Sequence, residues 1–244
     1  MLRFDSRERV FPSAVDGARH RADRSRPPRV YGHVVRQDGR AWLQYWIFYA
    51  SNLQDRGIVR TGRHDGDWEF VQLRVASGGR PDRVTFAQHA WAEGCGWSQV
   101  RRAGGAPVVF VANGSHASYS RPGKHDRLFP DPNDEADGRG RTMRPRVERI
   151  GDERPAWVAW PGRWGDSRPG LWPGEQGSPR GPRFQDERWT RPAAFHASAV
   201  ECGSGPPWRA WHTVLVALCA ACALGVAGLG LILARRRRDL QSPR

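Results

Sequence analysis

Lysine and methionine are nearly absent from this sequence of 244 residues. Lys124 is the only lysine, and there are 2 methionines. The net charge of +14 therefore comes almost entirely from arginine, which is scattered along the chain rather than grouped on one helix. Because proteins that bind nucleic acids usually gather their basic residues into a patch or stripe, the sequence argues against a nucleic-acid partner.

Cysteine is scarce as well, and its spacing excludes a zinc knuckle. Of the 4 cysteines, Cys219 and Cys222 lie inside an apolar run, so only Cys95 and Cys202 could form a bridge within a folded domain. A disulfide between these two would require an oxidising compartment. The alternative is two separate thiols, and the sequence leaves both open.

Charge is missing from one long stretch, residues 213–234. At about 1.5 Å per residue this stretch spans roughly 33 Å, which matches the hydrocarbon core of a bilayer. We predict a transmembrane helix at 213–234, preceded by a juxtamembrane linker at 201–212 and followed by a basic tail at 235–244. The arginines at 235–238 should stay on the cytoplasmic side. The chain is thus predicted to be a single-pass protein of the cell membrane, with its N-terminal domain outside and its C-terminal tail in the cytoplasm.

The first residues do not fit that orientation, because MLRFDSRERVF contains no apolar export segment. Two explanations compete. Either the true start lies upstream of Met1, or the protein is tail-anchored with its domain in the cytosol. We expect the first, for a reason that comes from a resemblance described below.

Short alternating apolar runs, separated by turn residues about every ten positions, predict an all-β fold. Strands are expected at 41–50, 67–75, 82–91, 96–102 and 107–112. This spacing is typical of an antiparallel β-sandwich.

We predict a jelly-roll-like sandwich over residues 30–200, after an Arg-rich N-terminal segment at 1–29. Residues 121–207 are dense in proline, glycine and tryptophan. Because that many tryptophans are unusual in a free linker, we expect long loops that fold back over the sandwich.

The strand at 67–75 begins with two carboxylates on the face that should be buried. Asp67 and Glu69 point to the same side, about 7 Å apart, and three aliphatic residues follow them on that face. An unpaired carboxylate there would cost roughly several kcal/mol or would take up a proton. A divalent cation would compensate, and so would an arginine such as Arg63 or Arg74. The spacing alone does not choose between these partners.

His116 is a second candidate, because it follows an apolar strand within NGSHASY. It is either an acid/base or a further ligand near the same site, or else a turn histidine bonded to the backbone. Ser115 and Ser118 lack the Gly-x-Ser-x-Gly elbow, so we expect no serine nucleophile. The acidic run at 131–140 lacks the spacing of a calcium loop and is expected to be solvated.

Several blocks of the sequence resemble the vacuolar protein sorting-associated protein sixty-two family, as it occurs in bacteria. They are YWIFYASN, HDGDWEFVQL, VTFAQHAW, PVVFVANGSHASY and SPRGPRFQDERWTRP, in this order, and the likeness covers roughly residues 2–195. LRFDSRERVFPSAVDG resembles the usual opening of that family, which in bacterial members follows an export segment. This resemblance is the reason to expect a start upstream of Met1.

HDGDWE also resembles, more distantly, the signature Gly-His-Arg-His-Asp-Trp-Glu of the necrosis- and ethylene-inducing peptide-like proteins. That family holds a divalent cation inside a β-sandwich with the first histidine, the Asp and the Glu of the signature and an earlier Asp. The resemblance implies metal ligands at Asn52, His64, Asp67, Glu69 and His89, with Asn52 in place of the earlier Asp. Such a donor set suits Mg²⁺, Mn²⁺, Ca²⁺ or Zn²⁺.

These features predict a membrane-anchored extracytoplasmic protein that uses a divalent cation to bind a polar ligand, such as a glycan or a lipid head group. Trp91 and Trp97 could supply a stacking platform for a sugar, although burial in the core is their commoner role. One alternative is a metal-dependent hydrolase with His116 or His89 as the acid/base. Another is a structural surface protein without a site. The absence of a nucleophile motif or phosphate-binding loop favours binding over catalysis.

Overall fold

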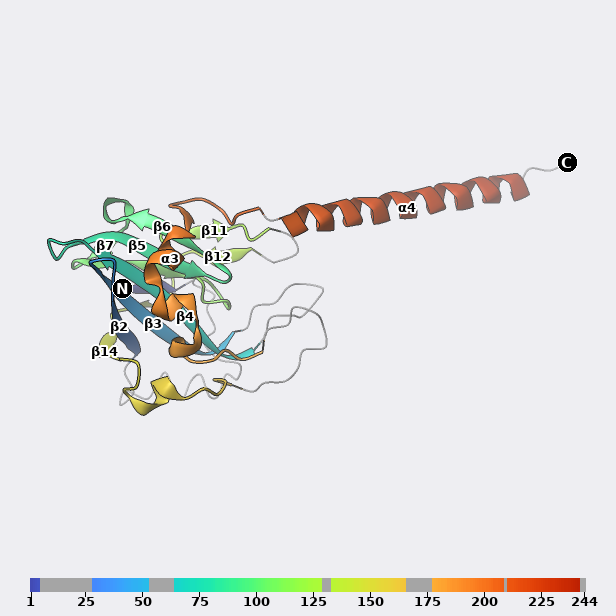
Figure 1. Cartoon of the computed structure of the whole chain (residues 1–244). Coiled ribbons are helices and arrows are strands. Elements are labelled where there is room, and N and C mark those ends of the chain that lie inside the picture. The colour runs from blue at the N-terminus through green and yellow to red at the C-terminus, as the bar shows by residue number, and fades with distance from the viewer. Residues whose placement is uncertain (5–27, 53–63, 129–132, 166–176, 209, 242–244) are drawn as a thin grey trace. The chain divides into compact units, whose positions relative to one another are not determined.

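The computed structural model describes residues 1–4, 28–52, 64–128, 133–165, 177–208 and 210–241 (Figure 1). Contacts divide the chain into two units, Met1–Pro206 and Pro207–Arg244, which are described separately below. The first unit is mostly β, and the second is a single helix.

The larger sheet of the first unit has seven strands in the order β14-β2-β3-β4-β5-β6-β15. Its centre is an antiparallel meander, in which each strand pairs with the next along the chain. The predicted strands at 41–50 and 67–75 are confirmed as β3 and β4, whereas the strand predicted at 82–91 is divided between β5 and β6 by a turn at residues 89–90. The bounds of the five central strands are β2 (Arg29–Gln37), β3 (Arg40–Asn52), β4 (His64–Val75), β5 (Pro81–Gln88) and β6 (Trp91–Gly96).

The smaller sheet has four strands in the order β10-β9-β1-β13. They are β10 (Ser118–Tyr119), β9 (Val109–Val111), β1 (Leu2–Phe4) and β13 (Thr142–Met143). The described part of the first unit also contains the two-stranded pairs β7 (Arg102–Ala103) with β8 (Ala106–Pro107) and β11 (Gly123–His125) with β12 (Asp134–Ala136). Because β1 lies inside the smaller sheet, the β domain includes residues from the segment that was expected to precede it.

Three pairings differ from the antiparallel sandwich that was predicted. At the two edges of the larger sheet, β14 (Arg146–Arg149) runs parallel to β2 and β15 (Val200–Glu201) runs parallel to β6. In the smaller sheet, β1 runs parallel to β9. Each pairing joins segments that are far apart in sequence. A long connection can return in either direction, whereas a tight hairpin can only produce an antiparallel pair.

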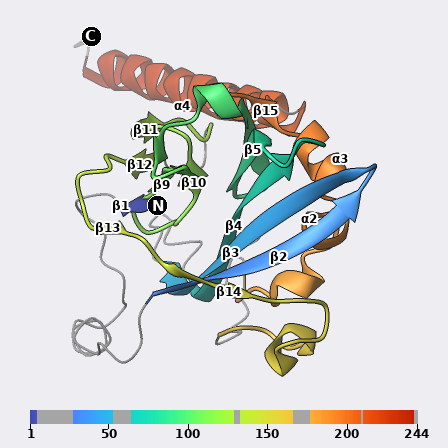
Figure 2. The ribbon, with the colours of Figure 1, turned by 90° about the vertical axis from the view of Figure 1, so that its left-hand side faces the viewer.

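The larger sheet is covered on both faces (Figure 2). Between the two sheets, residues of β3, β4 and β5 pack against Leu2, Val109 and Val111 of the smaller sheet. On the other face, Trp46, Phe70 and their neighbours pack against Trp189 and Phe195. Residues Trp68 to Gln72 of β4 are consequently buried without interruption, which a strand covered on one face alone would not show.

Part of the predicted loop region is helical. Two short helices, α2 (Glu187–Thr190) and α3 (Pro192–Ala197), lie on the larger sheet, and the 3₁₀ turns η2 (Ala156–Ala159) and η3 (Pro182–Phe184) precede them. Trp189 and Phe195 dock on rings of the sheet, with centroids 6.0 Å from Trp46 and 5.1 Å from Phe70. This packing stabilises helices that are too short to form alone.

The strand predicted at 96–102 is wrong. Residues Trp97–Gln99 form the 3₁₀ turn η1, because the Gln99 side chain folds back and accepts a hydrogen bond from the Gly96 backbone N–H at 2.7 Å. The chain therefore turns immediately after β6 and does not extend the sheet.

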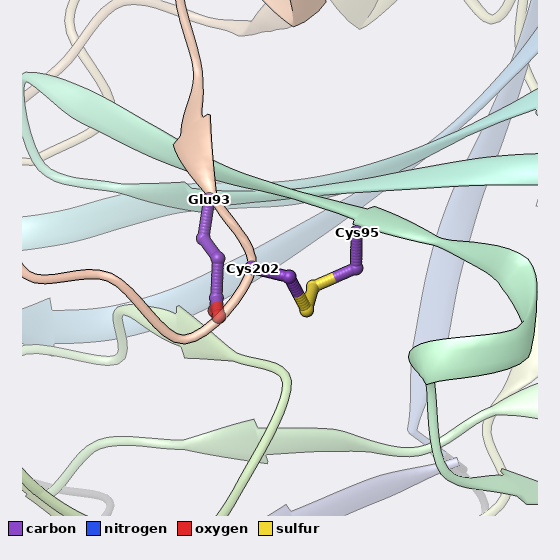
Figure 3. A group of neighbouring side chains, drawn as sticks. All are labelled: Glu93, Cys95 and Cys202. Carbon is purple, nitrogen blue, oxygen red and sulfur yellow. A yellow bond between two sulfur atoms is a disulfide. The ribbon is translucent and has the colours of Figure 1, made fainter.

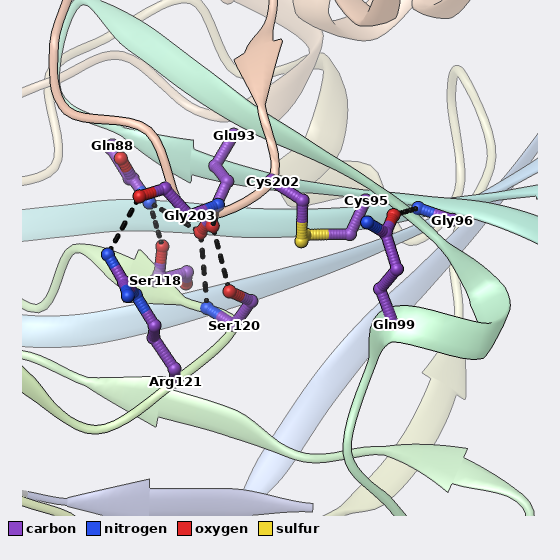
Figure 4. The surroundings of a disulfide bond; sticks show 10 residues. All are labelled: Gln88, Glu93, Cys95, Gly96, Gln99, Ser118, Ser120, Arg121, Cys202 and Gly203. Atoms are coloured by element: carbon purple, nitrogen blue, oxygen red, sulfur yellow. Dashed lines mark hydrogen bonds between the residues drawn. A yellow bond between two sulfur atoms is a disulfide. The ribbon is translucent and has the colours of Figure 1, made fainter.

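Cys95 and Cys202 form a disulfide with a Cα–Cα distance of 4.6 Å (Figure 3). The bridge joins β6 to the segment that follows β15, near the end of the first unit. Beside it, the buried carboxylate of Glu93 accepts hydrogen bonds from Ser120 Oγ at 2.8 Å and from the Gly203 N–H at 2.5 Å (Figure 4). The bridge and this carboxylate together hold the last residues of the domain against the sheet.

The second unit consists mainly of α4 (Ala210–Gln241). Its segment His212–Ala234, of 23 residues, is long and apolar enough to cross a membrane. The predicted span at 213–234 lies within it. Cys219 and Cys222 are free and exposed on this helix.

We predict that loss of the bridge destabilises the domain. A closed loop of about 100 residues corresponds to roughly 4–5 kcal/mol of unfolding free energy in the chain-entropy account. The double variant Cys95→Ser with Cys202→Ser should lose stability of this order in chemical denaturation of the detergent-solubilised chain. Cys219→Ser with Cys222→Ser is the matched control and should unfold like the parent. Equal midpoints for both variants would contradict a stabilising role.

Candidate functional site

The two carboxylates predicted to share the buried face of a strand lie on one face of β4, as the alternation of its residues indicates. Asp67 and Glu69 are on the β4 face that also carries Val71 into the core between the sheets. They are 7% and 6% exposed, so both are buried. Strand β5 pairs with β4 only from Val71 to Val75, whereas β3 pairs along the two acids, with Asp67 opposite Tyr49. Two acidic groups are thus held inside the domain near one end of a central strand.

Asp67 is hydrogen-bonded to two other buried side chains. The Asn52 amide donates to Asp67 Oδ2 at 3.4 Å, and His116 Nδ1 is hydrogen-bonded to the same oxygen at 3.0 Å. His116 is 2% exposed, and its ring stacks on Tyr49 with centroids 4.0 Å apart. The sequence left the role of His116 open, and the structure brings it into contact with Asp67 rather than leaving it as a separate turn histidine.

Glu69 has no comparable set of partners. Its Oε2 atom is buried and makes no hydrogen bond with any described residue. Burial raises the pKa of Glu69 well above the usual value of 4.5, and the nearby Asp67 charge raises it further. The charges of Arg188 and His116 act in the opposite direction but do not cancel these effects. The ionised form of Glu69 is therefore unfavourable, so that the carboxyl group is either protonated or bound to a cation.

The half-buried Arg188 carries a positive charge that acts on both carboxylates, and no motif in the sequence points to it. It lies on α2, with its guanidinium carbon 5.9 Å from the ring centre of Phe70 and 5.5 Å from that of Phe195. It donates a hydrogen bond to the carbonyl of His89. Burial lowers the pKa of Arg188, while Glu69 and Asp67 raise it. The two aromatic rings thus support a positive charge that offsets part of the acidic charge on β4.

A third buried carboxylate, Asp134, organises the neighbouring polar network. It accepts hydrogen bonds from Ser115 Oγ at 2.6 Å and Tyr119 OH at 2.6 Å, and it pairs with His89 Nε2 at 2.8 Å. Burial alone would raise the pKa of Asp134. The His89 charge and hydrogen bond, together with Arg127 and Ser115, hold it well below its usual range. Asp134 is therefore ionised and fully occupied with protein partners.

Two predicted ligands make other contacts in the structure. His89 pairs with Asp134, as described above. His64 Nδ1 is hydrogen-bonded to the Gly66 carbonyl at 2.7 Å. Gly66 stands where the related signature has its second histidine, and a Cβ there would lie 1.6 Å from the Trp164 carbonyl oxygen, at a φ of +67°. A side chain therefore cannot occupy position 66 in this fold.

The donor set at Asp67 and Glu69 fits a hard divalent cation. Two carboxylates and the Asn52 amide supply oxygen atoms, which are the preferred ligands of Mg²⁺, Mn²⁺ and Ca²⁺. The orphaned Oε2 of Glu69 is the particular atom such an ion would satisfy. Within the described ranges, one group of three His, Cys, Asp or Glu side chains has all its ligand atoms within 4.8 Å of one another, at Glu93, Cys95 and Cys202. Its two sulfurs are joined in the disulfide, so that group is not a metal site (Figure 3).

Sequence reasoning missed Asp134 and Arg188. The run at 131–140 was expected to be a solvated acidic loop, but Asp134 within it is 2% exposed. No periodicity marks either residue, since Asp134 lies in a three-residue strand and Arg188 in a single helical turn. Arg188 has one signal, because it falls inside SPRGPRFQDERWTRP, a block quoted for the family resemblance, whereas Asp134 has none.

Comparison with known families confirms the predicted resemblance. The family model for vacuolar protein sorting-associated protein 62 matches residues 35–127, which include β3 to β6 and Asp67, Glu69 and His116. A search of curated proteins gives no match to this chain.

Among solved structures, the chain is similar to necrosis- and ethylene-inducing proteins at low identity. One is Necrosis and Ethylene inducing Protein 2 from the causal agent of cocoa's Witches Broom disease, with 13% identity over 50% of each chain and a TM-score of 0.34. Another is NLPPya in complex with glucosamine, with 14% identity over 52% of this chain and 53% of that one, and a TM-score of 0.34. A third is described as a toxin fold for microbial attack and plant defense, with 11% identity, 61% and 68% coverage and a TM-score of 0.39. The chain spans about half the length of the first two.

We predict that the stability of the metal-free domain depends on pH through Glu69. A carboxyl group whose folded pKa is raised contributes stability below its unfolded value of 4.5, and that stability is lost as the pH rises through the folded pKa. In the presence of a chelator, the free energy of unfolding of the parent protein should therefore fall as the pH rises above 4.5. Glu69→Gln should remove this slope and stabilise the neutral-pH protein by on the order of 1–3 kcal/mol, the usual cost of an unsatisfied buried polar group.

Asp134 provides the internal comparison for this measurement. Its folded pKa is lowered, so its contribution is present above the unfolded value of 3.8 and is lost only as the pH falls below it. The two carboxyl groups thus act in separate pH windows. An unchanged slope above pH 4.5 in Glu69→Gln, measured by urea denaturation, would show that Glu69 does not titrate as described.

Proposed function

We propose that this chain is a membrane-anchored, extracytoplasmic binding protein whose β domain holds a divalent cation and uses it to recognise a glycan or lipid head group. The observation that carries the proposal is the Glu69 carboxylate, which is buried beside Asp67 with one oxygen that bonds to no described residue. Two acids on a core face need a positive partner, and the charge of Arg188 compensates only part of their charge.

In this proposal each residue of the cluster has a distinct task. Asp67, Glu69 and Asn52 would hold the ion through oxygen atoms, whereas His64 and His89, the further ligands that the resemblance implies, are bonded to the Gly66 carbonyl and to Asp134. When bound, the ion supplies open coordination positions for hydroxyl or phosphate oxygens of a ligand. His116 holds the Asp67 carboxylate in place through its hydrogen bond, and the stacked Tyr49 ring fixes the orientation of His116.

The location of the domain is inferred from the disulfide and from α4. Disulfides persist in oxidising compartments, so the Cys95–Cys202 bridge supports a domain outside the cytoplasm. The apolar segment His212–Ala234 would be the anchor, and the arginines that follow it favour a cytoplasmic C-terminus. We further propose that the two described sheets form the jelly-roll-like sandwich that the sequence predicts.

Binding is favoured over metal-dependent hydrolysis by the contacts that occupy His116 and His89. A general acid or base must reach its substrate directly or through one water molecule. His116 is 2% exposed and stacked on Tyr49, and His89 is paired with the ionised Asp134. Both histidines are therefore better placed to organise carboxylates than to exchange protons with a substrate.

The cation is tested by direct titration. The full chain in detergent should bind one Mn²⁺ with an increase in melting temperature, and Asp67→Asn with Glu69→Gln should weaken binding by roughly 100-fold or more, because both charged ligands are lost. Glu153→Gln with Glu201→Gln is the matched control, since it removes two exposed carboxylates. Calorimetry that detects no Mn²⁺ uptake by the parent, or equal uptake by both variants, would refute the site.

The orientation is tested with the single lysine. Lys124 is exposed in the domain, so a membrane-impermeant amine reagent should label it on intact cells that express the full chain. Mass spectrometry should find the label on the Lys124 peptide, and Lys124→Arg should remove it. Labelling of Lys124 only after lysis would instead place the domain in the cytosol, as in the tail-anchored alternative.

A further inference from the structure

Two shallow, open hollows border Trp97, at the end of the larger sheet away from the carboxylates. One has a volume of about 650 Å³ and is lined by residues of η1, of the β7–β8 hairpin and of the start of β5. The other has a volume of about 590 Å³ and is lined by Trp97 with residues of β4, β5 and η1. Arg74, which lines the second hollow, follows Glu69 by five residues on β4, roughly 16 Å along the strand. The hollows are therefore separate from the proposed cation site.

Arginine dominates the charge of both hollows. Arg80 and Arg102 line the first, and Arg74 and Arg83 line the second. Among the described residues that line them, Asp82 is the only carboxylate. Asp82 is already occupied by Arg74, through hydrogen bonds of 2.9 Å from Nε and 2.7 Å from Nη2. The hollows therefore carry a strong excess of positive charge.

Three of these arginines have no acidic partner. Arg80, Arg83 and Arg102 form no ion pair with any carboxylate in the described part of the chain, and all three are exposed. A fourth guanidinium is close, since Arg144 Nη1 lies 3.9 Å from the position of a Cβ on Gly104, in the first hollow. Several unpaired guanidinium groups around a concave surface attract anions and can hold phosphate, sulfate or carboxylate groups with two parallel hydrogen bonds.

The partly exposed indole ring of Trp97 adds a rigidly held apolar surface to the two hollows. Its ring is partly exposed where it borders both hollows, and its buried part packs against the core between the sheets. The Gln99 side chain closes the turn that carries it, and the Arg102 guanidinium lies 5.5 Å from its ring centre. Two residues earlier, Cys95 is tied by the disulfide. An indole held in this way can stack on a sugar ring without losing side-chain entropy.

We propose that the two hollows form a binding site for an acidic oligosaccharide, one that carries sulfate, phosphate or carboxylate groups. Trp97 would stack on a sugar ring, and Arg80, Arg83 and Arg102 would bind the anionic groups on either side of it. The shape favours a saccharide over an anionic membrane surface. A membrane-binding tryptophan projects from the protein into the head groups, whereas Trp97 is half-buried where the two hollows meet its ring.

The test measures saccharide binding to the full chain in detergent, at about 0.15 M salt, where long-range attraction is largely screened. The probes are a sulfated tetrasaccharide prepared from heparin, a trimer of galacturonic acid and mannose 6-phosphate, with uncharged maltotetraose as the reference. At least one acidic probe should bind, and maltotetraose should bind at least about tenfold more weakly. Trp97→Leu and the pair Arg80→Gln with Arg102→Gln should each weaken the acidic probe by roughly tenfold or more, about 1.4 kcal/mol.

Matched controls separate this site from general attraction to a basic protein. Arg149→Gln with Arg154→Gln removes two exposed arginines elsewhere on the domain and should change affinity by less than about twofold. Melting curves identify any variant that fails to fold, and the two-arginine variant, which changes only exposed side chains, keeps the test valid if Trp97→Leu unfolds. The titrations are repeated in the presence of a chelator, which removes any ion from the cation site, so that binding retained there is assigned to the hollows and not to Asp67 and Glu69.

Three outcomes would overturn the proposal. One is that none of the acidic probes binds. Another is that the control pair weakens binding as much as the pair in the hollow, which would indicate non-specific electrostatic attraction. The last is that the chain binds only to vesicles of phosphatidylglycerol and phosphatidylcholine, and that Arg80→Gln with Arg102→Gln abolishes this binding, which would assign the surface to the membrane.

Discussion

The described structure depends on two carboxylates that lie on a buried face of a central strand. Asp67 and Glu69 alternate into the same core as Val71, where an ionised group without a partner is strongly unfavourable. Asp67 is stabilised by Asn52 and His116. Glu69 is not, and burial and the neighbouring charge raise its pKa. This unequal distribution of partners is what makes the cluster a candidate cation site rather than a closed hydrogen-bond network.

The surrounding charges are placed by segments that are remote in sequence. His116 comes from the turn after β9, Asp134 from β12 and Arg188 from α2, and all of them act on the Glu69 pKa. Arg188 can remain charged inside the domain because aromatic rings and a backbone carbonyl surround it. The cluster therefore combines acids, histidines and two arginines, Arg188 and Arg127, and burial and the Asp67 charge still raise the pKa of Glu69.

Strand β4 also separates two regions of opposite chemistry. The acids lie near its beginning, and Arg74 lies near its end, where the arginine-lined hollows flank Trp97. Because about five residues of extended chain separate the two regions, the charges at one end do not directly neutralise those at the other. The same sheet thus carries buried acids near one end and exposed arginines near the other. The disulfide from β6 to Cys202 stabilises the side of the sheet next to the hollows.

The sequence by itself determined the strong periodic features. The alternation of β3 and β4, the shared face of Asp67 and Glu69 and the uninterrupted apolar helix were all predictable, because each depends on residues that are close together in the chain. The family resemblance had the same basis, since it rested on contiguous blocks.

Only the tertiary structure determined which residues contact the buried polar side chains. The contacts of His116 with Asp67 and of His89 with Asp134 join residues 49 and 45 positions apart, and no local pattern specifies such pairs. The same is true of the disulfide across 107 positions, of the parallel edge strands, and of the burial of Asp134 at the start of β12. Local sequence determines the face of the strand on which a side chain lies. The long connections determine which residues contact that side chain, and these contacts set its protonation state.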